Sequence, residues 1–226
     1  APIVSACKEF ASSASVPVCL HLDHGKDFQT VAKSLFLGFS SVMFDGSLLP
    51  IQENTAITSS LVQVAHSNGI SVEAEIGVVG KDEDNNTSSN QPQAKLTDVS
   101  EAVEFCKKTQ IDALAISIGN IHGVSRPAIE LNEPLLRKIH QSVSIPLVLH
   151  GSSGVRDASL KQAIGYGICK INVATRIINQ VGQALLEHYQ GNSHFNQYKI
   201  LTKEVINSIK EEVKNRIQVF GSSNKA

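Results

Sequence analysis

Short apolar runs alternate with helix-like segments along most of the chain. Within 51–67, for example, Ile57, Leu61 and Val64 recur at the spacing of one helix face. Strands that are separated by helices pair in parallel, because a parallel pair needs a long crossover connection. The alternation therefore predicts an α/β fold built on a parallel sheet. The six apolar runs, which are rich in β-branched residues, are 18–23, 41–45, 71–76, 113–118, 146–150 and 170–174.

The size and charge of the chain limit its partners. With 226 residues, of which 42% are hydrophobic, it is long enough for one large domain with a substantial core. The formal net charge is −1 and no apolar run is long enough to cross a bilayer, so we expect no nucleic-acid partner and no membrane partner. A small-molecule substrate is the default expectation.

The four cysteines indicate a reducing compartment. They lie in apolar segments and form no C-x-x-C pair. We expect them to be reduced core residues in a soluble, cytoplasmic protein. These cysteines are Cys7, Cys19, Cys106 and Cys169.

The first apolar run ends on polar groups. His21, Asp23 and His24 close it, and a glycine follows. The carboxyl ends of parallel strands are where α/β folds build their active sites. A carboxylate beside an imidazole can place a proton-transfer group next to a metal ligand, if the backbone turns both toward one cavity. The alternative is that Asp23 caps the next helix and His24 is satisfied by the backbone.

Two further histidines repeat this position. His24, His122 and His150 each close a predicted strand and each precede a glycine. Equivalent ends of parallel strands meet at one rim, and three protein ligands with an open fourth position are what a catalytic zinc ion needs. The three histidines therefore predict a metal site. A buried supporting role is expected for His21, and surface positions are expected for His66, His140, His188 and His194.

The strand 71–76 carries two carboxylates inside an apolar frame. Glu73 and Glu75 are two residues apart, so both point to the same face. Unpaired charges there would be costly, and the run contains no lysine or arginine. They either pair with buried basic groups from elsewhere or contact a metal or substrate. The strand 41–45 also closes on a carboxylate, Asp45.

Two turns near the end of the chain resemble anion sites. The Gly/Ser run at 151–154 and the residues 172–175 offer backbone N–H and hydroxyl donors after predicted strands. No P-loop or dinucleotide motif is present in the sequence, which argues against a nucleotide. A metal beside an anion site implies a small phosphorylated substrate. The irregular segment 78–97 is either a surface loop or an active-site lid.

These motifs carry a family resemblance. The chain resembles the class II, metal-dependent ketose-bisphosphate aldolases, which include the fructose- and tagatose-bisphosphate aldolases. The resemblance implies a TIM (βα)8 barrel and a lyase of carbohydrate metabolism and glycolysis that cleaves a ketose bisphosphate, or a related sugar phosphate, to dihydroxyacetone phosphate and an aldehyde. It also implies a catalytic zinc ion and a homo-oligomer, either a dimer or a tetramer. The segments that match in order and spacing are LHLDHG, SVMFDGS, SVEAEIG, GNIHGV, PLVLHGSSG and KINVAT.

The resemblance also implies roles for individual residues. Asp23 would be the acid/base at the hydroxyl of the bond that is broken, and Glu83 would move a proton at the dihydroxyacetone phosphate carbon. The metal ligands would be His24, His122 and His150, with Asp45 and Glu75 approaching the metal or a second divalent position. The phosphate-binding turns, where a monovalent cation could also bind, would contain Gly123, Gly151, Ser152, Ser153, Asn172, Val173, Ala174 and Thr175.

Three features depart from the family pattern. Only six of eight βα units are visible, so we expect residues 1–226 to form a barrel domain that is incomplete at its N-terminus and lacks the first two strands. Lys81 replaces one glycine of a usual pair, and Arg176 is unusual in the last turn. The alternatives are a non-catalytic aldolase-like domain, or a module of a larger multidomain protein, and, less favoured, a metal-dependent isomerase or epimerase.

Overall fold

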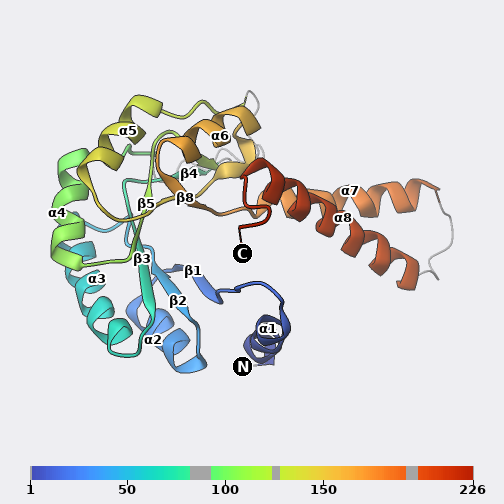
Figure 1. Cartoon of the computed structure of the whole chain (residues 1–226), viewed down its shortest axis with the longest axis horizontal. Coiled ribbons are helices and arrows are strands. Elements are labelled where there is room, and N and C mark those ends of the chain that lie inside the picture. The colour runs from blue at the N-terminus through green and yellow to red at the C-terminus, as the bar shows by residue number, and fades with distance from the viewer. Residues whose placement is uncertain (1, 82–92, 124–127, 192–197, 226) are drawn as a thin grey trace.

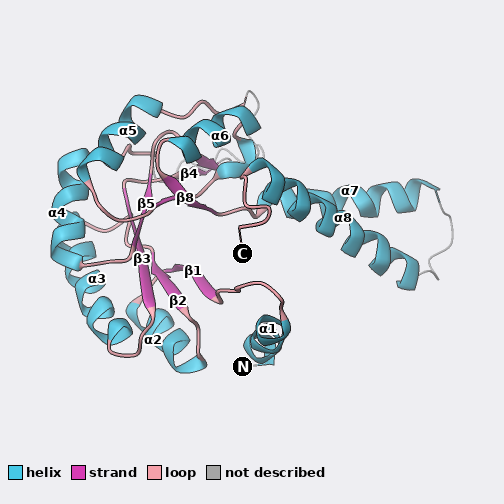
Figure 2. Ribbon diagram, viewed as in Figure 1, coloured by secondary structure: helices cyan, strands magenta, loops and turns pink. Residues whose placement is uncertain are grey.

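A curled sheet of six parallel strands, in the order β1-β2-β3-β5-β7-β8, forms the centre of the fold. The computed structural model describes residues 2–81, 93–123, 128–191 and 198–225. Helices α2 to α6 cover the outside of the arc (Figure 1, Figure 2). The predicted α/β class is confirmed, and the curl is that of a half-barrel. The strands are β1 (His21–Gly25), β2 (Ser41–Phe44), β3 (Ser71–Ile76), β5 (Ala113–Ile116), β7 (Leu147–Leu149) and β8 (Ile168–Ile171).

The helices begin where the sequence supplies caps. Asp27 accepts a hydrogen bond from the Thr30 N–H, and Asp98 accepts two from N–H groups of the next turn. Gly38, with φ of +84°, ends its helix in the left-handed conformation that glycine adopts without strain. The helices are α1 (Pro2–Ser13), α2 (Phe28–Leu37), α3 (Ile51–His66), α4 (Val99–Thr109), α5 (Glu133–Ser142), α6 (Asp157–Gly165), α7 (Thr175–Gly191) and α8 (Tyr198–Val219), with a short 3-10 helix η1 (Ser152–Gly154).

The main core lies between the sheet and its helices. Phe44, Leu114 and Leu147 from the strands pack with residues of the covering helices, such as Phe105. Alternate strand residues face the inside of the arc, where the apolar cluster is small and contains Met43. The register places Glu73 beside Met43. The inside of the arc is therefore where polar side chains are available for chemistry.

A second, two-stranded sheet was not expected from the sequence. It consists of β4 (Gly80–Lys81) and β6 (Ile121–His122), which pair in parallel. Each follows a strand of the main sheet, β3 and β5, so it lies beyond their carboxyl ends. The strands have two residues each, which is too short for a period-2 pattern to reveal them.

Helices α7 and α8 form a hairpin that extends away from the sheet (Figure 1). Arg216 of α8 anchors it by donating to Asp157 of α6, with 2.7 Å between Nη1 and Oδ1. The expectation that His188 lies at the surface was wrong, because its side chain is buried and bonded to Glu204 of α8. A helix that looks solvated in isolation buries whichever face its partner covers.

The expectation of core cysteines was also wrong. Cys7, Cys19 and Cys169 are exposed and Cys106 is half-buried, although all four are free. Cys106 packs against the edge of the main core, whereas the other three cysteines lie at the surface. Within the described ranges, none of the helices combines the length and apolarity that a membrane span requires.

Candidate metal and acid–base site

The end of β1 has an unusual backbone. The pairing register with β2 shifts between Leu22 and Gly25, and His24 has a φ of +48°, which is rare and strained for a non-glycine residue. A bulge of this kind re-aims side chains. It turns two consecutive residues to one side, so that Asp23 Oδ1 lies 3.9 Å from His24 Nε2. The backbone condition for an adjacent proton-transfer group and metal ligand is thus met.

The structure brings the three strand-end histidines together. The ring centroids of His24 and His150 lie 4.5 Å apart, and that of His122 lies 5.2 Å from His24. One ring nitrogen of each falls within 4.8 Å of the others. Gly151, with φ of +61°, makes this approach possible, because a Cβ there would lie 2.6 Å from the carbonyl carbon of Ile121. Strand β6 can therefore pack closely against the turn that follows β7, which places His122 beside His150.

Two of these histidines form a hydrogen bond to a carboxylate through the ring nitrogen that points away from the other histidines, here called the outer nitrogen. His24 Nδ1 bonds to Asp45 and His150 Nε2 bonds to Glu73, each at 2.8 Å. The inner nitrogens, His24 Nε2 and His150 Nδ1, lie 3.9 and 3.8 Å from Asp23 Oδ1. Metal-binding histidines usually donate their second N–H to a carboxylate, which fixes the tautomer and the ring orientation. The inner nitrogens are therefore the ones that could coordinate a metal.

His122 is suited to coordination by its charge state. Burial, followed by the positive charges of His24 and His150, lowers the pKa of His122 to about 4. Its imidazole is then neutral at pH 7, which is the form that binds metals. One ring nitrogen from each of the three histidines, with Asp23 beside them, fits a zinc ion with an open fourth position.

Glu73 has the basic partner that the sequence did not reveal. Lys170 of β8 lies 2.9 Å from Glu73 Oε2, while the other carboxylate oxygen bonds to His150. Burial alone would raise the pKa of Glu73, but the bonds to His150 and Lys170 hold it below its usual range. Metal or substrate contact is not needed to explain this carboxylate. Its partner comes from a strand nearly a hundred residues away.

Asp45 and Glu75 behave differently from each other. Asp45 bonds to His24, to the Lys26 ammonium and to the Ser47 hydroxyl at 2.6 Å, and these bonds outweigh burial and hold its pKa well below the usual range. Glu75 Oε2 has no hydrogen-bond partner, and burial together with the charge of Asp45 raises the pKa of Glu75 to about 8. His24, Asp45 and Glu75 form a second group that could hold a cation.

The predicted anion turns converge at the start of α7. Ser152 Oγ donates to the Asn172 carbonyl at 2.7 Å, and Ser153 Oγ accepts from the Arg176 N–H at 3.3 Å. Thr175 begins this helix of 17 residues, whose first N–H groups and dipole favour an anion. The Arg176 guanidinium contacts the Val155 carbonyl instead of the turn.

The other predicted residues have simple positions. Gly123 directly follows β6, and Val173 and Ala174 connect β8 to α7. The predicted acid Glu83 lies outside the described residues, as does His194.

Comparison with known proteins identifies the family. The model of the family described as "Fructose-bisphosphate aldolase class-II" matches residues 1–225. The chain belongs to the class II fructose-bisphosphate aldolase family. It is therefore a lyase, of a family that acts on small sugar phosphates.

Two curated relatives and one solved structure support this assignment to the class II aldolases. A sulfofructosephosphate aldolase from Alkalicoccus urumqiensis is 39% identical over 222 residues, which are 96% of this chain and 75% of the relative. A 6-phospho-5-dehydro-2-deoxy-D-gluconate aldolase from Shouchella clausii is 38% identical over 214 residues, 94% of this chain and 71% of the relative. The crystal structure of the YdjI aldolase from Escherichia coli K12 matches with a TM-score of 0.86 at 34% identity, covering 100% of this chain and 77% of that chain.

Two lysines of this class II aldolase were missed at the sequence level. Lys26 follows the first histidine motif and Lys170 opens the last one, KINVAT. A lysine within an otherwise apolar buried strand is itself a signal, because it needs a partner. Its partner could not be named without the sheet order, which places β8 near β3 across the arc.

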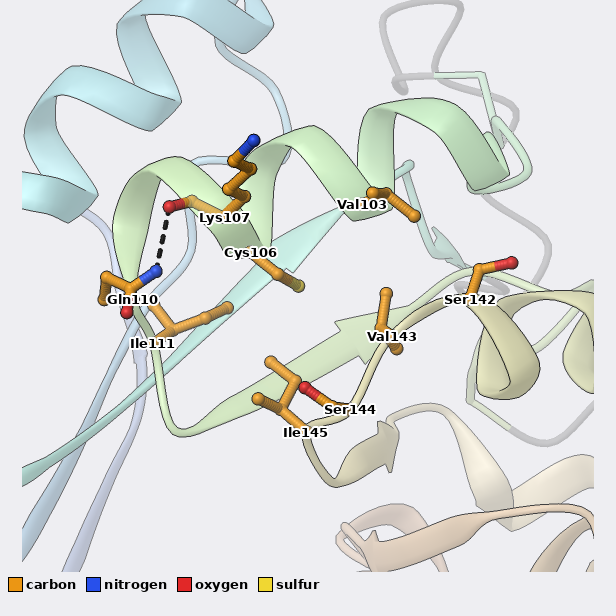
Figure 3. A pocket seen from close by; sticks show the side chains of 9 residues that line it. All are labelled: Val103, Cys106, Lys107, Gln110, Ile111, Ser142, Val143, Ser144 and Ile145. Atoms are coloured by element: carbon orange, nitrogen blue, oxygen red, sulfur yellow. Dashed lines mark hydrogen bonds between the residues drawn. The ribbon is translucent and has the colours of Figure 1, made fainter.

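A cavity elsewhere in the aldolase does not belong to this site. It lies between α4 and the segment that leads into β7, lined by residues such as Val103, Cys106 and Val143 (Figure 3). These residues adjoin the amino ends of β5 and β7, opposite the histidines. Burial raises the pKa of the Cys106 thiol to about 11, so it is not a nucleophile at pH 7.

Proposed function

We propose that this aldolase catalyses zinc-dependent retro-aldol cleavage, and the reverse condensation, of a ketose bisphosphate or a related sugar phosphate. The products of cleavage would be dihydroxyacetone phosphate and an aldehyde. The observation that carries the proposal is the convergence of three histidine rings around Asp23, whose Oδ1 lies 3.8 and 3.9 Å from two inner ring nitrogens. The named relatives differ in their sugar, so the proposal is limited to the class of substrate.

The proposed metal ligands are the three histidines. His24 Nε2, His150 Nδ1 and a ring nitrogen of His122 would hold the zinc ion. Bound zinc supplies Lewis-acid polarisation of the substrate carbonyl oxygen. We assign Asp45 to orienting His24, and assign Asp45 and Glu75 together as ligands of a second divalent position. A monovalent cation would bind near the phosphate turns.

Asp23 is the proposed acid/base. In the cleavage direction it accepts the proton of the hydroxyl at the bond that breaks, and in condensation it returns that proton. Its side chain is 52% exposed, so substrate can reach it. Asn172 donates to Asp23 Oδ1 at 2.9 Å and thereby orients the carboxylate. Glu83 is proposed to move the proton at the dihydroxyacetone phosphate carbon.

The proposed phosphate site is formed by the turns at the start of α7. Backbone N–H groups there, together with the helix dipole, supply donors and positive potential for a phosphate. The buried hydroxyls of Ser152 and Ser153 already hold the two turns together. The assigned residues are Gly123, Gly151, Ser152, Ser153, Asn172, Val173, Ala174 and Thr175.

We also infer that residues 1–226 belong to a single (βα)8 barrel domain, to which the main sheet contributes six of the eight strands. Strands β1 and β8 are at opposite edges of the sheet, yet Asn172 after β8 bonds to Asp23 on β1. The arc therefore curls far enough for two more strands to close it between these edges. Free cysteines support a cytoplasmic protein. Exposed apolar side chains on the α7–α8 hairpin, such as Ile178 and Ile206, support a homo-oligomer.

The test is release of dihydroxyacetone phosphate from fructose 1,6-bisphosphate and from tagatose 1,6-bisphosphate. We expect a chelator to abolish cleavage and added zinc to restore it. The variant Asp23→Ala should keep its zinc and lose cleavage by about 10³-fold, whereas Glu9→Ala on the exposed helix α1 should match the unmodified protein. Cleavage that survives metal removal would contradict the proposal. Bound zinc with no carbon–carbon cleavage would favour an isomerase, an epimerase or a non-catalytic domain.

A further inference from the structure

We propose that Lys170 is a positioning residue that holds the zinc ligand His150 and the acid/base Asp23 in place together. It does so through two intermediaries, Glu73 and Asn172. The Lys170 ammonium lies 2.9 Å from Glu73 Oε2 and donates to Asn172 Oδ1 at 2.7 Å. This inference rests on the proposed function, because it assumes the roles assigned there to His150 and Asp23.

The first branch runs through the Asn172 amide. An ammonium has only donors, so the atom that faces Lys170 must be the amide oxygen. The amide nitrogen then points into the site, 2.9 Å from Asp23 Oδ1 and 3.3 Å from His150 Nδ1. The Asp23 carboxylate favours this orientation as well, because it repels an amide oxygen, but without the lysine the amide oxygen loses its donor and the side chain its second anchor. Lys170 therefore helps to hold the amide N–H on Asp23.

The second branch runs through the Glu73 carboxylate. One oxygen contacts Lys170, and the other accepts from His150 Nε2 at 2.8 Å. The side chains of Glu73 and His150 are 2% and 1% exposed, so water does not replace the bond between them, while the Lys170 side chain, 37% exposed, reaches the carboxylate from the solvent side. The carboxylate thus fixes the ring with Nδ1 toward the proposed zinc position. Lys170 fixes the carboxylate.

Lys170 is the cation that holds Glu73 in this arrangement, and the nearby His21 does not share that contact. His21 Nε2 approaches Glu73 Oε2, but at 3.7 Å, and that nitrogen has no hydrogen-bond partner. Burial and the charge of Lys170 lower the pKa of His21, so it is neutral at pH 7. Its other nitrogen bonds to the Ser41 hydroxyl. Among the described residues, the ammonium that contacts Glu73 is that of Lys170.

The alternative is an ion pair that serves only the stability of the interior. The two roles differ in their readouts. A stabilising pair lowers the melting temperature when it is removed, and the folded protein keeps its zinc affinity. A positioning residue also changes zinc affinity, through His150. It changes cleavage more than proton exchange at dihydroxyacetone phosphate, because Asp23 acts only on the hydroxyl proton of cleavage.

The experiment compares Lys170→Met with the unmodified protein. The control is Lys108→Met, which removes an exposed ion pair with Glu104 on α4. Zinc affinity is measured by competition with a chelator. Cleavage of the bisphosphate that the unmodified protein cleaves, and deuterium exchange into dihydroxyacetone phosphate, are measured at saturating zinc. Circular dichroism verifies folding.

We expect Lys170→Met to weaken zinc binding by about tenfold or more. Cleavage should lose about 100-fold in kcat, with exchange losing less than about tenfold. Lys170→Arg, which keeps a cation with several donors, should recover most of the zinc affinity. Lys108→Met should change none of these quantities. If Lys170→Met does not fold, Lys170→Gln, which keeps an amide donor, replaces it. This variant should lose zinc affinity and cleavage in the same pattern, but by smaller factors.

Unchanged zinc affinity in folded Lys170→Met would overturn the inference. Equal losses of cleavage and exchange would also overturn it, since they indicate a structural role. The zinc titration does not require any turnover. If the unmodified protein cleaves neither bisphosphate, the proposed function fails, while the zinc titration still decides the link from Lys170 to His150.

Discussion

Two histidines of the site are supported by the same chemical pattern in different surroundings. His24 is held by Asp45, which contacts Lys26, and His150 is held by Glu73, which contacts Lys170. Both histidine–carboxylate distances are 2.8 Å. The His24 ring is 24% exposed and the His150 ring is 1% exposed. We call His24, Asp45 and Lys26 the His24 set, and His150, Glu73 and Lys170 the His150 set. Both lysines reach solvent, with side chains 59% and 37% exposed, and both carboxylates are buried. The difference between the sets is that water can reach the His24 ring and not the His150 ring.

This difference predicts unequal tolerance to change. Where water can reach a histidine ring, it can replace a hydrogen-bond partner that the ring has lost. Where it cannot, the remaining donor is left unsatisfied in a low-dielectric interior, which is costly. We therefore expect the His24 set to be tolerant and the His150 set to be sensitive. The predictions below compare equivalent substitutions on the two sides.

The largest contrast is expected between Glu73→Gln and Asp45→Asn. Both keep the shape of the side chain and remove its charge. Glu73→Gln should lower the free energy of unfolding by about 3 kcal/mol, because it leaves a lysine and a buried ring with poorer partners. It should also weaken zinc binding by about 10- to 100-fold. Asp45 is also buried, but the His24 ring and the Lys26 ammonium that it contacts both reach water, so Asp45→Asn should cost less, about 1–2 kcal/mol. Urea unfolding and zinc titration measure both effects.

The control for this pair is Glu104→Gln, which removes the carboxylate of an exposed ion pair on α4. Its effect on unfolding should be below about 0.5 kcal/mol. Equal losses in Glu73→Gln and Asp45→Asn would show that solvent access does not distinguish the two sets.

The sequence predicted one of these sets more fully than the other. All three members of the His24 set lie in two neighbouring βα units, and strand-end positions alone indicated His24 and Asp45. Each of the six predicted runs also overlaps a strand of the main sheet, although the first and last are displaced by two or three residues, because the hydrophobic pattern is a local signal.

The His150 set could not be assembled from sequence. Its members come from β7, β3 and β8, and no spacing relates residues in three separated strands. For Glu73 the sequence leaves two alternatives open, a buried basic partner or a metal or substrate, and the structure shows the first, with His150 and Lys170 as the partners. The prediction of a surface position for His188 was wrong for the same reason, since its burial depends on the packing of α8 against α7. Local elements are predictable, whereas pairings across the fold depend on topology.

The two glutamates of strand β3 also differ in their surroundings. Glu73 has two partners, whereas Glu75 Oε2 has none and the pKa of Glu75 is raised to about 8. Between pH 4.5 and 8 the folded metal-free protein therefore binds a proton that the unfolded chain has lost. Folding stability must fall as the pH rises through this range, because the folded state holds more protons.

Glu75→Gln should remove this loss. The variant should match the metal-free protein near pH 5 and exceed its unfolding free energy by roughly 3–4 kcal/mol at pH 8, since one pKa unit corresponds to about 1.4 kcal/mol. Urea unfolding in a chelator, at a series of pH values, measures the difference. Glu53→Gln, on the first turn of α3, is the control and should leave the pH dependence unchanged. A constant offset between Glu75→Gln and the unmodified protein at all pH values would contradict this account.

The smallest effect on stability is expected for Lys26→Met. Its side chain is 59% exposed, and the buried Asp45 keeps His24 and Ser47 as partners when the ammonium is removed, so the loss should be about 1 kcal/mol or less. Its effect on metal binding should be larger, because the ammonium lies on the carboxylate that a second cation would need. A divalent ion at His24, Asp45 and Glu75 must displace Lys26 from Asp45. Native mass spectrometry during a zinc titration should therefore show the second ion binding about tenfold more tightly in Lys26→Met.

Lys33→Met, a nearby substitution on α2, should leave the second zinc affinity as it is in the unmodified protein. An unchanged second affinity in Lys26→Met would mean that the ammonium does not compete for Asp45. In that case the exposed lysine of the His24 set would serve neither stability nor metal selection, and only the His150 set would depend on its lysine. The two sets would then share a chemical pattern without sharing its purpose.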